Sequence, residues 1–220
     1  MKQGYAARFI KCLFGILVCG TGYYVSVQAV NIGIGAWETL QTGMSIRTGF
    51  LYGNCSVLVS IAVLVVDVFL KGKIGFGTIL NGLLIGKIVD AWRTWFNFLP
   101  PATVLWQGLL YLLAGQIILS VGMILYMKPE LGCGPRDTLM VQLGKRFPRA
   151  NIGIVRFAMD ITVFFIGVLL GAPYGWGSVF AIGCNSFIMQ GIFRIFGFES
   201  RSLTHESLAD TVKGIQGGHV

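Results

Sequence analysis

Long apolar stretches alternate with short polar segments along the chain. Each stretch has about the 20 residues that a helix needs to cross the roughly 30 Å hydrocarbon core of a bilayer. The stretches are continuously apolar rather than alternating, and a helix satisfies its own backbone hydrogen bonds in lipid. They therefore predict an all-α integral membrane protein with six transmembrane helices. The six stretches lie near residues 9–30, 51–70, 76–97, 105–127, 151–171 and 176–197.

The polar segments of the first half return in the second half. Residues 33–40 (GIGAWETL) are matched by 132–139 (GCGPRDTL), and residues 75–78 (GFGT) by 175–178 (GWGS). Each copy accompanies three apolar stretches, an odd number, so the second copy enters the bilayer from the side opposite to the first. The pattern predicts two inverted three-helix repeats. The predicted units are residues 1–98, residues 99–198 and a cytoplasmic tail, 199–220.

A short amphipathic segment follows the first apolar stretch of each unit, at residues 36–47 and 135–146. Twelve helical residues reach only about 18 Å, which is too short to cross a bilayer. Such a segment either lies along the interface or enters the membrane as a re-entrant half-helix. Gln41 and Gln142 suit the interface, whereas the preceding glycines and Pro135 suit a re-entrant turn. The sequence leaves both alternatives open.

Composition supports a membrane protein, and the charges predict its orientation. The chain is 55% hydrophobic and 12% charged, which leaves too little polar surface for a soluble globule. The net charge of +8 does not indicate nucleic-acid binding, because no basic stripe with interleaved aromatic residues occurs. Basic residues instead gather at alternate ends of the stretches, which places both termini in the cytoplasm by the positive-inside rule. These residues are Lys2, Arg8, Lys11, Lys71, Lys73, Lys128, Arg136, Lys145, Arg146, Arg149, Arg194, Arg201 and Lys213.

The sequence contains no catalytic or metal-binding pattern. It has no Ser/His/Asp set, HExxH motif or phosphate loop, and its Gly-x-Gly turns lack the third glycine of a nucleotide-binding fingerprint. The five cysteines form no CxxC pair, and both histidines, His205 and His219, lie in the polar tail. We therefore expect no enzymatic activity, no metal ion and no cofactor.

An acidic residue and a threonine begin each short segment, as Glu38-Thr39 and Asp137-Thr138. One interpretation is structural, since an acid in the first turn of a helix caps free N–H groups and complements the helix dipole. The other is functional. Two half-helix starts, brought together by the pseudo-two-fold symmetry of a repeat, would present N–H groups and hydroxyls to a shared cavity.

Ionisable residues within the apolar stretches form a second set of candidates, because charged groups are costly at bilayer depth. Arg156 and Asp160 lie four residues apart on one helical face, where they form either a structural ion pair or a solute or proton site. Lys87 and Asp90 are placed to neutralise each other in the same way.

Two further expectations concern packing. The third stretch of each unit is rich in glycine, which allows close helix contacts in lipid, so we expect the third helices to form the contact between the units. Asp67 lies one turn from Lys71 and is expected to reach the membrane interface.

The repeated motif resembles that of a known family. Residues 33–40, followed by Gly-x-Gly-Thr-x2-Asn-x4-Gly-x3-Asp over residues 75–90, resemble the YczE/YyaS/YitT group of bacterial integral membrane proteins. The family pattern has an aspartate after Pro-Trp, from which residues 36–38 (AWE) and 135–137 (PRD) both depart. The resemblance covers roughly residues 8–198 and implies a multi-pass protein of the bacterial inner membrane. The signature positions that it implies are Gly35, Trp37, Glu38, Gly77, Thr78, Asn81 and Asp90.

These observations favour a small secondary transporter or permease for a polar small solute, with a carboxylate as candidate proton carrier. The alternative is a non-transporting membrane scaffold that recruits a cytoplasmic partner through residues 199–220. The expected partners are the lipid bilayer and an unidentified polar small molecule, and a homodimer stays open. The expected substrate-binding residues are Glu38, Thr39, Thr78, Asn81, Asp90, Asp137, Thr138, Arg156, Asp160 and Asn185.

Overall fold

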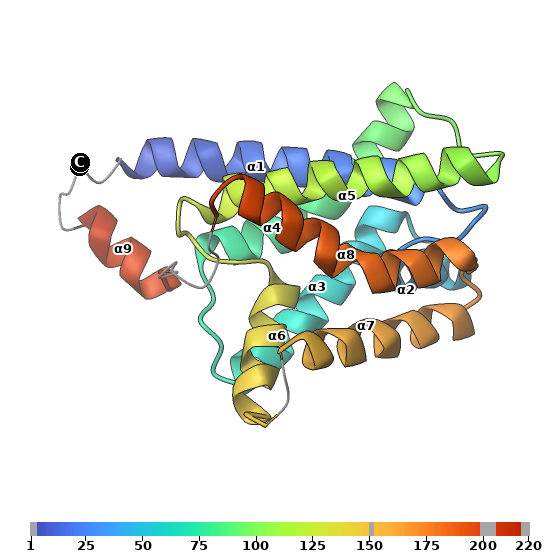
Figure 1. Cartoon of the computed structure of the whole chain (residues 1–220). Coiled ribbons are helices and arrows are strands. Elements are labelled where there is room, and N and C mark those ends of the chain that lie inside the picture. Colours follow the sequence, from blue (N-terminus) through green and yellow to red (C-terminus); the bar gives the residue numbers. More distant parts are fainter. Residues whose placement is uncertain (1–3, 150–151, 199–205, 217–220) are drawn as a thin grey trace.

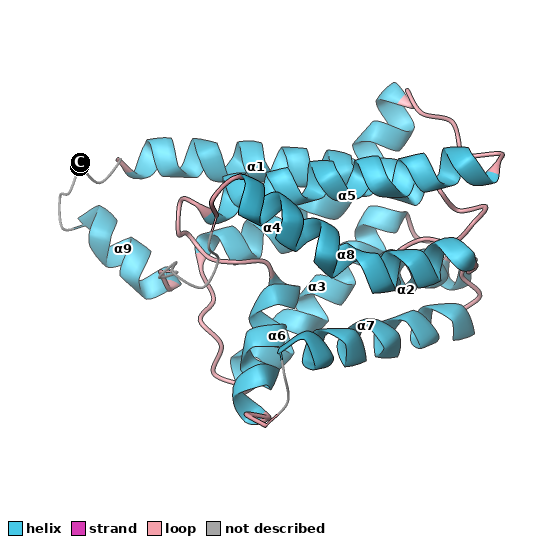
Figure 2. Cartoon of the chain, in the orientation of Figure 1, coloured by secondary structure: helices cyan, strands magenta, loops and turns pink. Residues whose placement is uncertain are grey.

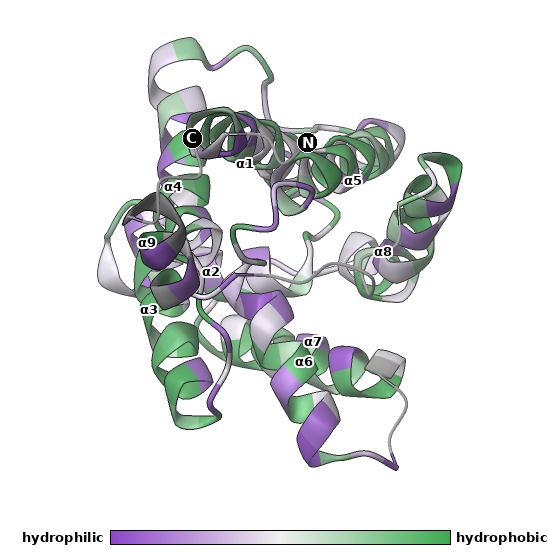
Figure 3. Ribbon diagram, turned by 90° about the vertical axis from the view of Figure 1, so that its left-hand side faces the viewer, coloured by the Kyte–Doolittle hydropathy of each residue, from purple (hydrophilic) through white to green (hydrophobic). Residues whose placement is uncertain are grey.

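The computed structural model describes residues 4–149, 152–198 and 206–216, and every regular element in these ranges is a helix (Figure 1, Figure 2). Four helices, α1, α3, α5 and α8, are long and apolar enough to cross a membrane. Figure 3 shows hydrophobic residues along the outer helices, and the side chains of Leu169 and Trp176 are 86% and 84% exposed. Such a surface suits lipid rather than water. The helices are α1 (Tyr5–Val27), α2 (Ala36–Thr48), α3 (Tyr52–Phe69), α4 (Phe76–Ala91), the π-helical η1 (Trp92–Phe96), α5 (Leu105–Met127), α6 (Pro135–Arg146), α7 (Ile152–Leu169), α8 (Trp176–Ile195) and α9 (Leu208–Gln216).

A helix occupies each of the six apolar stretches and each of the two short segments, as the sequence predicts. The third stretch differs in detail, because α4 ends at Ala91 and the chain continues as the wider turn η1. In this turn the rings of Trp92 and Phe96 lie 4.8 Å apart, and the indole N–H of Trp92 donates to the hydroxyl of Thr21 in α1 at 3.1 Å. The aromatic packing thus favours the local change of helix type.

Helices α1 and α5 run antiparallel with their backbones in close contact (Figure 1). A Cβ atom on Gly22 of α1 would lie 2.6 Å from the backbone nitrogen of Leu119 in α5. A Cβ atom on Gly122 of α5 would lie 2.6 Å from the backbone nitrogen of Cys19 in α1. Gly22 and Gly122 hold equivalent positions in the two halves, so the first helix of each half packs on the other through the same small surface.

This contact, rather than one between the third helices, is the most extensive helix pairing between the two halves. Gly82 and Gly86 of α4 pack against Ser60 and Ser56 of α3, which belongs to the same half. Around Gly183 of α8, no atom of the described chain lies within 4 Å of the position that a Cβ would take. The third helices therefore do not pack along each other as expected. Gly82 and Gly86 make room mainly for serine side chains of the same half, whereas Gly77 and Gly177, in the first turns of α4 and α8, meet the other half.

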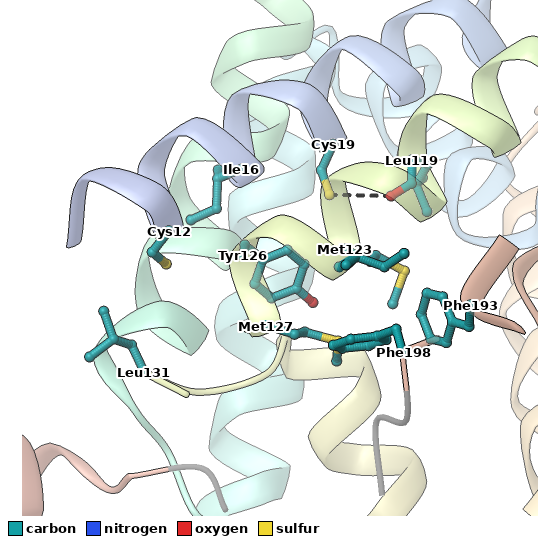
Figure 4. Close-up of a cluster of buried hydrophobic side chains, with 11 residues drawn as sticks. Cys12, Ile16, Cys19, Leu119, Met123, Tyr126, Met127, Leu131, Phe193 and Phe198 are labelled. Atoms are coloured by element: carbon teal, nitrogen blue, oxygen red, sulfur yellow. Dashed lines mark hydrogen bonds between the residues drawn. The ribbon is translucent and has the colours of Figure 1, made fainter. Parts of the chain in front are cut away.

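A hydrophobic cluster beside the α1–α5 contact fixes the end of α8 (Figure 4). Tyr126 of α5 packs there with Phe193 and Phe198, whose rings lie 4.9 Å apart. The thiol of Cys19 donates to the carbonyl of Leu119 at 3.6 Å along the same contact. The cluster therefore anchors one end of α8 to the central helix pair.

The turns of each half bind the other half. The N–H of Gly77, at the start of α4, donates to the carbonyl of Leu131 at 2.8 Å. The N–H of Gly177, at the start of α8, donates to the carbonyl of Ile32 at 2.7 Å. The first bond runs from the first half to the second, and the other joins the equivalent positions from the second half to the first. Each half therefore positions the loop that precedes the short helix of the opposite half.

Each of the two short helices packs against the opposite half. Gly43 of α2 packs against the backbone of Gly167 in α7, and α6 packs against α3, where Thr138 lies beside Gly72. Within the halves, α3 packs along α4, whereas α7 and α8 barely touch. The starts of α2 and α6 consequently meet, with Arg136 of α6 lying over the ring of Trp37 of α2.

The described part of the tail folds back onto the chain. Arg8 of α1 forms an ion pair with Glu206 at 2.9 Å, and the N–H of Leu208 donates to the carbonyl of Ile74 at 3.0 Å. Ser207 caps α9, and the hydrogen bond from its hydroxyl to Asp210 lowers the pKa of that carboxyl. Both histidines lie outside the described residues.

The α1–α5 contact predicts different effects of one substitution at two glycines. Gly22→Ala should destabilise the protein by about 1 to 3 kcal/mol, because the new methyl group would meet the backbone of α5. Gly183→Ala is the matched control, since it adds the same methyl group where there is open space. Thermal unfolding in detergent, followed by size-exclusion fluorescence, measures both. Equal melting temperatures for the two variants would contradict the assigned contact.

Candidate functional site: a polar cavity between the halves

A polar cavity lies where the two halves meet, and every helix from α1 to α8 contributes to its wall. It contains about 90 Å³ of space that the centre of a water molecule can occupy. A single water needs about 10 to 15 Å³ by this measure, so the cavity has room for several waters or one small polar solute.

The structure brings six of the ten predicted site residues together in the wall of this cavity. They come from α2, α4, α6, α7 and α8, and therefore from both halves of the chain. They are Glu38, Asn81, Asp137, Arg156, Asp160 and Asn185.

The three predicted threonines close turns instead of lining the cavity. The hydroxyl of Thr39 donates to the carbonyl of Gly35 at 2.8 Å, and that of Thr138 donates to the carbonyl of Gly134 at 3.2 Å. Thr78 accepts a hydrogen bond from the N–H of the residue before α4 at 3.2 Å. All three side chains are buried, so their role in the described conformation is to shape the helix starts.

Asp90 also lies outside the cavity. Both of its carboxylate oxygens accept the N–H of Gly53 at 2.9 Å, which caps the start of α3. The charge of Lys87 interacts with that of Asp90, as expected, although its ammonium group donates to the side-chain oxygen of Asn54 instead of to the carboxylate. This pair therefore ties α4 to α3 within the first half.

Asp160 connects the two halves across the cavity. One of its oxygens lies 3.9 Å from Nε of Arg156, and the other accepts the indole N–H of Trp37 at 2.9 Å. Trp37 belongs to α2 of the first half, whereas Arg156 and Asp160 belong to α7 of the second. The predicted ion pair is thus present and is also bound to the opposite half-helix.

Arg136 is the main cavity residue that the sequence analysis missed. Its guanidinium lies over the ring of Trp37, 4.6 Å from the centroid, and donates to the hydroxyl of Tyr23 at 3.1 Å. Its charge interacts with the carboxylates of Glu38 and Asp137. Counting Arg136 among the cytoplasmic basic residues was wrong, because the first turn of α6 carries it into the cavity wall.

The starts of α2 and α6 surround this guanidinium with acids. Glu38 is only 5% exposed, and its carboxylate folds back over Gly35. Asp137 accepts a hydrogen bond from the hydroxyl of Tyr126 at 3.3 Å. Trp37 and Arg136 occupy equivalent positions of the repeat, and each directly precedes the acid of its short helix. This alignment was the signal in the sequence that could have identified Arg136 as a cavity residue.

Several uncharged polar residues complete the cavity wall. Gln116 of α5 is 4% exposed, and its carbonyl oxygen has no hydrogen-bond partner within the described chain. A glutamine in the middle of a long apolar stretch is a signal of function that the sequence analysis also passed over. The other such residues are Tyr23, Ser56, Ser60 and Tyr126.

Asp67 differs from its expected position at the membrane interface. It is 0% exposed, and neither carboxylate oxygen has a hydrogen-bond partner within the described chain. The end of α3 packs here against the turn before α6, where the charge of Asp67 interacts with Cys133. The expectation that Asp67 reaches the membrane interface is therefore wrong, because its side chain is buried where α6 packs on α3.

The interaction between Glu38 and Arg136 predicts a non-additive pair of mutations. Arg136→Gln should destabilise the protein by on the order of 3 kcal/mol, because it leaves a buried carboxylate without a counter-charge. Adding Glu38→Gln should recover most of this loss, since the neutral pair has no charge to compensate. Arg47→Gln, at the exposed end of α2, is the charge-matched control. Thermal melts of Arg136→Gln, Glu38→Gln, the double variant and the control test this coupling, and additive losses in the double variant would exclude it.

Comparison with known proteins places this chain among membrane proteins of bacteria. It is 35% identical over 177 residues to an uncharacterized protein of Haemophilus influenzae, which covers 80% of this chain and 79% of the relative. It is 25% identical over 192 residues to the uncharacterized membrane protein YczE of Bacillus subtilis, covering 86% of this chain and 87% of YczE. The identity to YyaS of the same organism is 22% over 180 residues, or 80% of this chain and 87% of YyaS. No solved structure matches the chain.

A family model provides the assignment that these relatives support. The model described as "Family of unknown function (DUF6198)" matches residues 6–194, which include α2 to α7 and all but one residue of α1 and of α8. The resemblance to YczE and YyaS that the glycine motifs indicate is confirmed. The chain therefore belongs to the DUF6198 family and is related to the membrane protein YczE and to YyaS.

Proposed function

We propose that the protein is a small secondary transporter for a polar solute, with two inverted three-helix units that alternate around the central cavity. The observation that carries this proposal is the cavity itself. Carboxylates from both halves and two guanidinium groups converge on a partly open polar space inside an apolar helix bundle. Charged groups are costly at such a depth and are retained where they bind a solute or an ion.

The contacts between the halves support the inverted arrangement. Equivalent glycines meet in the antiparallel contact of α1 and α5, and equivalent turns exchange the bonds Gly77 to Leu131 and Gly177 to Ile32. An antiparallel contact between equivalent helices is what two units inserted in opposite directions would form. With the basic residues of the remaining loops on one side, both termini would lie in the cytoplasm.

Two further helices are needed for six spans, and their lengths are sufficient. Helix α7 has 18 residues, and α4 together with η1 runs without a break from Phe76 to Phe96. At about 1.5 Å per residue these lengths reach roughly 27 to 31 Å, close to the thickness of the hydrocarbon core. The short helices α2 and α6 would then be re-entrant, since their first turns lie at the central cavity.

The charges of the cavity indicate the kind of solute. Three carboxylates and two guanidinium groups line it, so a molecule with both a cationic and an anionic group can find partners for each. The starts of α2 and α6 add partial positive charge, which favours an anionic group between them. We propose a small zwitterionic or hydrogen-bonding solute, with Glu38, Asp137 or Asp160 as the proton-carrying acid.

Alternating access can be tested without knowing the solute. In a variant whose five cysteines are replaced by alanine, Asn185→Cys places one thiol in the cavity wall. A membrane-impermeant thiol reagent should label it in right-side-out and in inside-out vesicles, because the cavity opens to each side in turn. Phe187→Cys, on the exposed outer face of α8, is the control that should stay unlabelled. Labelling of the Asn185→Cys variant from one side only would exclude alternation.

The scaffold alternative requires a tail that is available to a partner. The described tail residues instead bind the chain itself, through Glu206 to Arg8 and Leu208 to Ile74. Deleting residues 206–220 should therefore leave the two-sided labelling of the cavity intact. Two results together would favour the scaffold. One is that mass spectrometry finds a cytoplasmic protein that co-purifies with the full chain and is lost on this deletion. The other is that the cavity of the full chain is labelled from one side only.

A further inference from the structure

An apolar groove of about 500 Å³ lies between α6 and α7. Leu139, Leu143 and Phe147 of the α6 side face Ile154 and Ala158 of α7 across it. The one hydroxyl in its described wall, that of Thr162, is already bonded to the carbonyl of Ala158 at 2.7 Å. The groove therefore suits a hydrocarbon chain.

One end of the groove is strongly basic. Phe147 lies at this end, and it is flanked along the chain by the exposed side chains of Lys145, Arg146 and Arg149. The ion pairs of the described chain are Arg8 with Glu206 and Arg156 with Asp160, so none of these three cations is held by an acid of the described residues. They are available to an anionic group at the level of the lipid headgroups.

We propose that this groove binds an anionic glycerophospholipid, with an acyl chain between α6 and α7 and the phosphate at Lys145, Arg146 and Arg149. The apolar wall and the cluster of cations match the two parts of such a molecule. A second copy of the chain fits less well, because it would bring the same basic cluster to the same surface. This site is separate from the cavity proposed for the solute.

The lipid would also contact two residues of the cavity wall, on the side that faces away from the cavity. Trp37 and Met159 line both the groove and the polar cavity, so they form the partition between them. The indole of Trp37 is bonded to Asp160 and covered by Arg136, both of which face the cavity. An acyl chain in the groove would therefore support the partition that holds these charged groups in place.

Photo-crosslinking with a defined lipid tests the site. The full chain is reconstituted in phosphatidylcholine vesicles that contain a trace of phosphatidylglycerol with a diazirine on its acyl chain. Illumination should label peptides of α6 and α7. The same diazirine on phosphatidylcholine should label them about tenfold less, because each basic residue near a headgroup favours an anionic lipid.

Two variants and one control define the outcome. The triple variant Lys145→Gln, Arg146→Gln, Arg149→Gln should lose most of the preference for phosphatidylglycerol, and Ala158→Trp should lose the label by filling the groove. Lys71→Gln, Lys73→Gln, Lys128→Gln removes the same charge from other exposed positions and should change neither. Equal labelling by both lipids in the unmodified protein would overturn the proposal. So would crosslinks between α6–α7 peptides of two copies in place of lipid adducts. Both readouts are independent of whether the protein transports a solute.

Discussion

The backbone contact between α1 and α5 is the constraint on which the rest of the structure depends. Lipid gives helices no hydrophobic reason to associate, so they must gain stability from close packing and hydrogen bonds. Glycines at equivalent positions allow this approach from both sides. Once the two helices are fixed, the turns that follow them reach the opposite half, and the half-helices α2 and α6 begin at a common centre.

The same arrangement explains why charges are tolerated in the centre. Glu38, Asp137 and Asp160 are each within reach of a guanidinium group, and Trp37 and Tyr126 supply further hydrogen bonds. Two of these contacts, Glu38 with Arg136 and Trp37 with Asp160, cross from one half to the other, so a movement between the halves would have to exchange them. A solute that replaces one of the two groups in such a contact would bind one arrangement of the halves more tightly than another. This difference in affinity is what couples binding to a change of conformation.

Helices and their limits could be predicted from the sequence, because apolar length and flanking glycines act locally. The six stretches, both short helices and most of the cavity acids follow from the pattern alone. Arg136 and Asp67 could not be placed, because their surroundings come from parts of the chain far away in sequence. The positive-inside rule assigns a residue by its position between spans, and a half-helix that returns into the protein breaks that assumption. The contact between the halves was predicted at the wrong helices for the same reason. Glycine content shows where a helix can be approached closely, but not which helix packs there.

Differences between the two halves bear on how they would alternate. Two identical inverted units would have two symmetry-related arrangements of equal energy, so every divergence between them favours one arrangement. Trp37 opposite Arg136 is one such divergence, and the tight α3–α4 packing against the loose α7–α8 contact is another. Asp67 is the third, because its counterpart at the α2–α7 contact is Gly167. A buried carboxylate without hydrogen-bond partners in the described chain is costly and has no equivalent on the other side, so in a protein that alternates it would favour an arrangement in which α3 and α6 separate.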